Sequence, residues 1–289
     1  MLISSYQERY ARSTEKIRVL LNFLKEETYS DFQIIKLLFD FKSDRPLYRL
    51  LEKVEKMGLI QKHVHESRAS RISLWGITTD GLAVILTADD NIMPARFEPY
   101  RLTGWSLDHH LDNQLVRLTL EKNGATGWIN GDRSTFLSQY SVKHRPDGLI
   151  SLPDGRLIAV ETERRIKTKA RYQSIMASHL LAISDKKWRY AFYVAPDEAK
   201  KRALKIIFDS IASVIVKNQH VQLEAKHRSE LNHKETEHAQ ETASLKNRIA
   251  WQSHIIGCLS FLLLKTSDIF RKAVHSVIRF TRDYYKPRF

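Results

Sequence analysis

Three carboxylates stand in or beside two apolar runs at the centre of the chain. Asp147 precedes the run 148–150, and Glu161 and Glu163 end the run 157–163, with a turn at 153–155 between the two. If the runs are neighbouring strands, side-chain alternation lets all three carboxylates meet on one face. Clustered carboxylates repel one another and need a cation, and hard oxygen ligands suit Mg²⁺ or Mn²⁺. The spacing therefore predicts a metal-dependent phosphodiesterase site, and the alternative is an edge hairpin whose acids are simply solvated.

The charge of the chain predicts a polyanionic partner. The 289 residues carry a net charge of +14, concentrated in residues 101–196, with 15 basic against 9 acidic side chains, and in residues 251–289, with 7 against 2. Nucleic acid or an anionic membrane is the expected partner. The single cysteine, Cys258, excludes an internal disulfide framework and a cysteine-rich zinc site. Because the N-terminus lacks an apolar signal core and the longest apolar run, 255–264, is too short to span a bilayer, we expect a cytoplasmic protein.

The first hundred residues show helical spacing followed by two strand-like runs. We expect helices over 14–27, 31–39 and 45–57, with Ser30 capping the second and Gly58 ending the third. Strands over 59–64 and 72–77 and a short helix over 82–86 follow. This order resembles the winged helices of bacterial regulators.

In a winged helix, the third helix enters the DNA groove and the wing contacts phosphate. The side chains expected to meet DNA are Arg45, Tyr48, Arg49, Lys53 and Lys56 on the helix, and Arg68 and Arg71 on the wing. The net charge of residues 1–100 is only +1, so a winged helix used for protein contacts is the alternative.

The central part of the chain alternates helix-like and strand-like segments. They are expected at 111–122 (helix), 126–129 (strand), the acidic hairpin, 167–184 (helix), 188–194 (strand) and 197–217 (helix). The fold class is α/β (α+β), with a mixed sheet. The expected domains are 1–88 (winged helix), 89–106 (linker), 107–217 (nuclease-like core) and 218–289 (charged helical or coiled-coil extension with a basic amphipathic tail).

The order of helix, three antiparallel strands, helix and further strand resembles the PD-(D/E)xK core of restriction-endonuclease-like nucleases. With the winged helix, the segments RPDGLI and AVETE more closely resemble the replication-relaxation family, which includes the MobC-type relaxases of mobilizable plasmids. The resemblance covers about residues 14–217. It implies a relaxase that makes a site- and strand-specific, metal-dependent nick at a plasmid transfer origin during conjugative mobilization.

The resemblance also implies roles for individual residues. Asp147 and Glu161 match the two acidic metal ligands of the core. Glu163 stands where many of these nucleases have a lysine, so it could act as a base or complete a second metal site. Lys167 could restore the positive charge, and the neighbouring pair Arg164 and Arg165 could clamp phosphate.

The histidines and tyrosines leave the attacking group open. His63 and His65 form an HxH pattern on the expected wing but lack a third ligand, and we interpret them as a surface feature. His109 and His110 are interpreted as contacts at a helix start. Any of the tyrosines, among them Tyr172 close to Lys167, could be a nucleophile, so a covalent tyrosine and simple hydrolysis both remain open.

Three functional hypotheses follow from these patterns. The first is a metal-dependent DNA nickase that works with an accessory mobilization protein and the membrane coupling protein. The second is a winged-helix regulator or replication initiator with an inactive nuclease core, and the third is a plain double-strand nuclease. The extension 218–289 could pair two chains, or contact a partner or the inner membrane surface.

Overall fold

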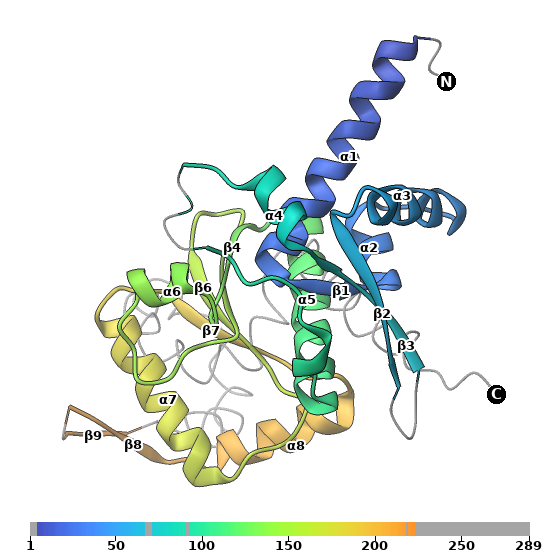
Figure 1. Cartoon of the computed structure of the whole chain (residues 1–289). Helices are drawn as coiled ribbons and strands as arrows, with labels where there is room; N and C mark the ends of the chain where they lie inside the picture. Colours follow the sequence, from blue (N-terminus) through green and yellow to red (C-terminus); the bar gives the residue numbers. More distant parts are fainter. Residues whose placement is uncertain (1–4, 67–70, 89, 91–92, 218, 223–289) are drawn as a thin grey trace, which may run out of the picture. The chain divides into compact units, whose positions relative to one another are not determined.

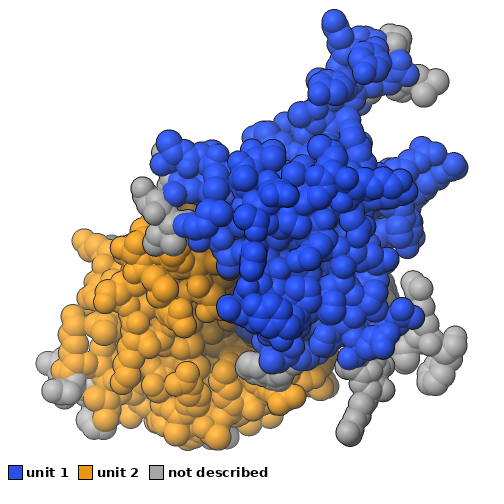
Figure 2. Space-filling model, in the orientation of Figure 1, with its two compact units in different colours: residues 1–118 blue, residues 119–289 orange. Residues whose placement is uncertain are grey.

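The chain is a mixed α and β protein that forms two compact units, residues 1–118 and 119–289 (Figure 2). The computed structural model describes residues 5–66, 71–88, 90, 93–217 and 219–222. Within these residues, no helix is long and apolar enough to cross a membrane. Arg68 and most of the expected extension 218–289 lie outside the described residues.

The first unit combines helices with a three-stranded antiparallel sheet of order β1-β3-β2 (Figure 1). Its elements are α1 (Tyr6–Glu27), β1 (Tyr29–Asp31), α2 (Phe32–Leu38), α3 (Arg45–Lys56), β2 (Ile60–Glu66), β3 (Arg71–Ile77), α4 (Thr79–Ile85), the 3₁₀ turn Pro99–Arg101 and α5 (Gly104–Lys122), whose last residues enter the second unit. The three expected helices and two expected strands are therefore present. Gly58 has φ +73°, as expected of a glycine just after a helix.

Two details of the first unit differ from the sequence-based expectation. Residues 29–31 form the strand β1, which pairs with β3, where no strand was expected. Asp31 caps α2, because its carboxylate accepts the Ile34 N–H at 2.7 Å. Ser30, the expected cap, is buried and donates instead to Gln114 Oε1 at 2.6 Å. Gln114 belongs to α5, so the first turns of this helix are held to the first unit, although the sequence assigned them to the nuclease-like core.

The second unit contains a mixed four-stranded sheet of order β4-β5-β6-β7. Its elements are β4 (Thr126–Asn130), α6 (Ser134–Gln139), β5 (Gly148–Ser151), β6 (Leu157–Thr162), α7 (Lys169–Ser184), β7 (Tyr190–Val194), α8 (Glu198–Asp209) and the hairpin β8 (Ser213–Val216) with β9 (Gln219–Gln222). The first three strands are antiparallel and β6 pairs with β7 in parallel. A parallel pair requires a crossover, and α7 supplies it.

The helices α6 and α7 cover one face of this sheet. Leu149, Ala159 and Ala191 from the strands form a buried cluster with Phe136 of α6 and Ala182 of α7. The small side chains at 159, 182 and 191 let the helix approach the sheet closely. The acidic hairpin is therefore present as β5 and β6, with one face buried under α7.

The helix expected over 197–217 is shorter than the sequence suggested. It ends at Asp209, and residues 213–216 form β8. Val214, Ile215 and Val216 are β-branched and favour a strand once a partner is available. That partner is β9, so residues 219–222 of the expected helical extension are also strand.

Gly131 permits a close backbone approach beside the hairpin. Its N–H donates to the Asp147 carbonyl oxygen at 3.1 Å, and a Cβ at this position would lie 1.8 Å from the Pro146 carbonyl oxygen. We expect Gly131→Ala to push residues 146 and 147 away and to lower the free energy of unfolding by about 1–3 kcal/mol, measured by urea denaturation. Gly104→Ala is the control, because its added Cβ meets no atom within 4 Å. Equal effects of the two substitutions would show that the approach at Gly131 is no constraint.

Candidate active site

The register of β5 and β6 brings Asp147 across from Glu161. Gly148 pairs with Val160, so the preceding residue on β5 lies opposite the following residue on β6. Asp147 Oδ2 accepts the backbone N–H of Thr162 at 2.6 Å, which holds this carboxylate at the end of β6. Two of the three predicted acids are thus neighbours across the hairpin.

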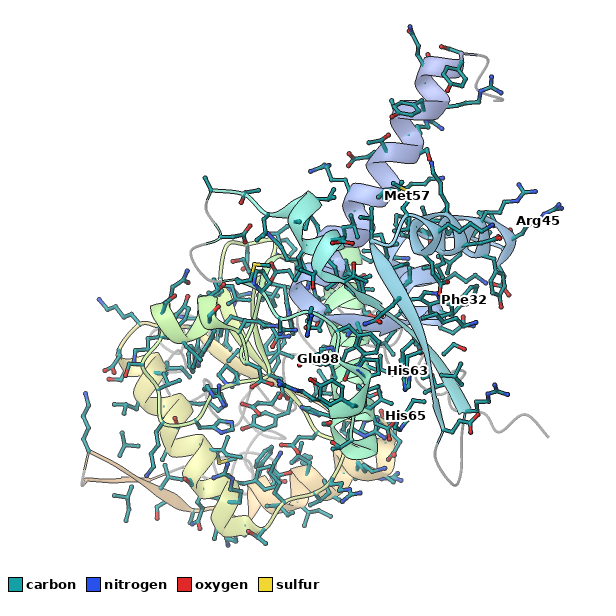
Figure 3. The ribbon with its side chains drawn as sticks, viewed as in Figure 1. Phe32, Arg45, Met57, His63, His65 and Glu98 are labelled. Atoms are coloured by element: carbon teal, nitrogen blue, oxygen red, sulfur yellow. The ribbon has the colours of Figure 1, made fainter. Side chains whose placement is uncertain are left out.

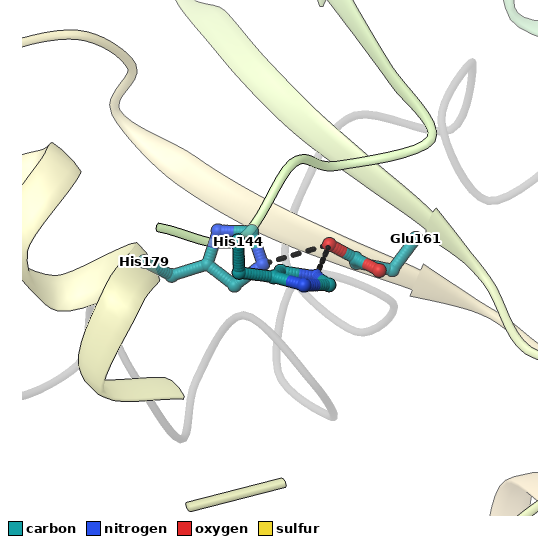
Figure 4. Close-up of side chains that lie close together, drawn as sticks. All are labelled: His144, Glu161 and His179. Carbon is teal, nitrogen blue, oxygen red and sulfur yellow. Dashed lines mark hydrogen bonds and ion pairs between the residues drawn. The ribbon is translucent and has the colours of Figure 1, made fainter. Parts of the chain in front are cut away.

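Glu161 faces α7 and is bound by two histidines. The Nε2 atoms of His144 and His179 lie 2.8 and 2.9 Å from the same oxygen, Glu161 Oε1 (Figure 4). His179 comes from α7, and His144 comes from the loop before β5. The backbone N–H of His144 donates to Ser178 Oγ of α7 at 3.0 Å. Glu161 and His179 are buried, while the His144 side chain remains 18% exposed. Three separate segments therefore meet on one carboxylate oxygen.

The two histidines keep Glu161 ionised. Burial by itself raises the pKa of a carboxyl, because it disfavours the charged form. At Glu161 the hydrogen bonds and charge of His144 and His179 outweigh burial and lower the pKa from 4.5 to about 2. Glu161 is thus a carboxylate across the whole neutral range.

The pKa of Glu163 is shifted upward, in contrast to that of Glu161. Glu163 is 1% exposed, Lys167 Nζ contacts its Oε1, and its Oε2 is buried with no hydrogen-bond partner. Burial raises the pKa of Glu163, Lys167 lowers it, and the charges of Glu161 and Asp147 raise it again, so that the net shift is upward. A buried carboxylate oxygen without a partner is costly and marks a place where a cation would bind favourably.

Two tyrosines line this part of the sheet but are poorly suited to attack DNA. Tyr172 is fully buried, its hydroxyl oxygen accepts the Lys167 N–H at 3.2 Å, and burial raises its pKa to about 12. Tyr193 pairs with Glu161 in the β6–β7 register, and burial raises its pKa well above 10. Both phenols stay protonated at neutral pH, and Tyr172 is not accessible to a strand of DNA.

The predicted metal ligands and the group of potential ligands that the structure brings together share only Glu161. Among the described residues, the histidine and acidic side chains whose ligand atoms all lie within 4.8 Å of one another are His144, Glu161 and His179. Asp147 and Glu163 are not part of this group. Neither histidine was predicted to be a ligand, because His179 lies inside a helical segment and His144, although it stands three residues before Asp147, is part of no ligand motif.

The remaining predicted residues lie at or near the surface. Arg165 is exposed and Arg164 is partly buried, directly after Glu163. On α3 the predicted DNA-facing side chains are all exposed: Arg45, Tyr48, Arg49, Lys53 and Lys56. Figure 3 shows Arg45 projecting from one end of α3, and His63 and His65 along β2. His110 Nε2 lies 2.7 Å from the Glu27 carbonyl oxygen, a structural contact within the first unit.

Comparisons with known proteins leave the family of this chain open. No protein-family model, no curated protein and no solved structure matches it.

The pKa of Glu161 predicts how stability changes with pH. A carboxyl whose folded pKa lies below its unfolded value stabilises the fold above the unfolded pKa and loses that effect as pH falls. For Glu161 the contribution should be full above pH 4.5 and disappear toward pH 2. The shift corresponds to at most about 3 kcal/mol. We expect the stability difference between the parent and Glu161→Gln in urea denaturation to shrink over this range, and a constant difference would contradict this assignment.

Glu163→Gln is the matched control, because the pKa of Glu163 is shifted upward whereas that of Glu161 is shifted downward. A carboxyl with a raised folded pKa contributes stability below its unfolded pKa and loses it as pH rises. Since the pKa of Glu163 is raised, Glu163→Gln should be at least as stable as the parent at pH 7.

Proposed function

We propose that this chain is a metal-dependent DNA endonuclease whose active site comprises Asp147, Glu161, Glu163 and Lys167. The observation that carries the proposal is the buried Oε2 of Glu163, which lacks a partner although two further carboxylates stand close enough to raise the pKa of Glu163. A divalent ion such as Mg²⁺ or Mn²⁺ would relieve this repulsion, so the residues present fit the ion that the sequence predicts.

The strand order of the second unit supports the nuclease core. Helix α5 precedes the antiparallel strands β4, β5 and β6, and α7 leads to β7, which lies parallel to β6. This is the order expected from the resemblance to PD-(D/E)xK nucleases. The acids lie at the end of the β5–β6 hairpin, where that resemblance places them.

Each residue has a defined task in the proposed reaction. A bound divalent ion would neutralise the phosphodiester and lower the pKa of the attacking oxygen. Asp147 and Glu161 would hold the ion. Glu163, with its raised pKa, would accept a proton from the attacking water or hydroxyl. Lys167 Nζ, on a side chain that is 38% exposed, would stabilise the charge developing on the phosphate.

The first unit supports DNA binding. Three helices and the β2–β3 hairpin follow one another in winged-helix order, and α3 buries its apolar stripe while exposing four basic side chains and Tyr48. Lys and Arg on such a helix contact phosphates and base edges. From the resemblance to MobC-type relaxases we infer that the activity is a nick at a plasmid transfer origin. The expected partners are an accessory mobilization protein and the membrane coupling protein.

A nicking assay tests the proposed activity. We expect the parent to convert supercoiled plasmid carrying a transfer origin to open circles in Mg²⁺ or Mn²⁺ and not in EDTA. Asp147→Asn and Glu163→Gln should each lower the rate by at least about a hundredfold, because the metal and the base are lost. Agarose electrophoresis measures the conversion.

The products separate the competing hypotheses. Linear DNA would indicate a plain double-strand nuclease. A footprint without cutting would favour the regulator with an inactive core. Protein attached to the cut 5′ end would point to a covalent tyrosine, and a free end to hydrolysis. Equal cutting by the parent and Asp147→Asn would show that the proposed site is wrong.

The salt dependence of DNA binding tests whether the exposed basic side chains of α3 contact DNA phosphates. Arg49→Ala should weaken binding and reduce the slope of log K against log salt by about 1, since one phosphate contact is lost. Arg101→Ala is the control, because Arg101 is exposed in the same unit but already pairs with Glu98 at 2.9 Å. Fluorescence anisotropy with a labelled duplex measures both. An unchanged slope in Arg49→Ala would exclude Arg49 from the DNA interface.

A further inference from the structure

The group of His144, Glu161 and His179 has the geometry of an ion-binding site in the second unit. Both Nε2 atoms converge on one carboxylate oxygen at 2.8 and 2.9 Å, and the two imidazole rings are nearly perpendicular, at 84°. Ligands of a tetrahedral ion bound at about 2.0–2.1 Å stand roughly 3.3 Å apart. The two Nε2–Oε1 distances would have to lengthen by only about half an ångström to accept such an ion, which small side-chain rotations can supply.

The supporting segments hold these ligands in place without an ion. Glu161 is part of β6 and His179 part of α7, and both are buried. The loop that carries His144 is attached to α7 through the Ser178 hydroxyl. A preorganised ligand set loses little conformational entropy when it binds.

The ligand types select a different ion from the one expected for the carboxylates alone. Mg²⁺ prefers oxygen ligands, whereas two imidazoles with one carboxylate suit Zn²⁺ and related first-row ions. Three protein ligands leave a fourth position open, as in catalytic zinc sites. Of the three side chains, His144 is the one partly exposed to solvent, at 18%.

We propose that His144, Glu161 and His179 bind a Zn²⁺-type transition-metal ion. The ion would join the loop before Asp147, strand β6 and helix α7, and so fix the position of Asp147. The inference deepens the proposed function, because Glu161 serves both sites, but its test measures metal binding in the absence of DNA.

Zinc binding by the full-length, tag-free protein tests the proposal. After metal removal, equilibrium dialysis against Zn²⁺ and elemental analysis should show about one more bound equivalent in the parent than in His144→Gln or His179→Gln. His65→Gln is the matched control, since His65 lies on β2 of the first unit and should bind as the parent does. Equal zinc content in the parent and His144→Gln would overturn the proposal.

A second measurement on the parent protein does not depend on any variant folding. Diethyl pyrocarbonate modifies accessible histidines, and peptide mass spectrometry locates the modified residue. Zn²⁺ should protect His144 several-fold and leave His65 unprotected. Unprotected His144 would overturn the proposal.

The zinc experiments and the nicking assay can fail separately. Zinc binding without DNA cutting would contradict only the nuclease, and DNA cutting in Mg²⁺ without zinc binding would contradict only the site proposed here.

Discussion

The buried carboxylate of Glu161 requires compensation, and the second unit is arranged around that requirement. An ionised group in a low-dielectric interior is strongly unfavourable unless it is paired and hydrogen-bonded. His144 and His179 provide both, which explains why the pKa of Glu161 falls although the side chain is buried. Meeting this requirement brings a loop, a strand and a helix together.

The three buried glutamates of the described residues show different degrees of compensation. Glu27 in the first unit meets Arg117 Nη1 at 2.6 Å, and Glu161 has its two histidines. Glu163 has Lys167 on one oxygen, while the other is buried without a partner. Of the three, Glu163 is therefore the least compensated, with a pKa raised by burial and by the neighbouring carboxylates.

Much of the architecture followed from local pattern. Apolar spacing predicted α3 and α7, and Gly58 marked the end of α3 with the expected positive φ. The apolar runs around the turn at 153–155 predicted the β5–β6 hairpin. The strands β1 and β8 were missed, because segments of three or four residues become strands only through the partners that pair with them.

The sequence by itself determined the acidic hairpin, the basic outer face of α3 and the mixed α and β class, because each depends on residues close together in the chain. Only the tertiary structure decided which side chains surround Glu161. His144 and His179 lie 17 and 18 residues from it on either side, and only the loop and α7 bring them to one oxygen. The tertiary structure also gives Glu161 and Glu163 opposite pKa shifts. Burial raises the pKa of both, but only Glu161 has two histidine partners that lower it below its usual value.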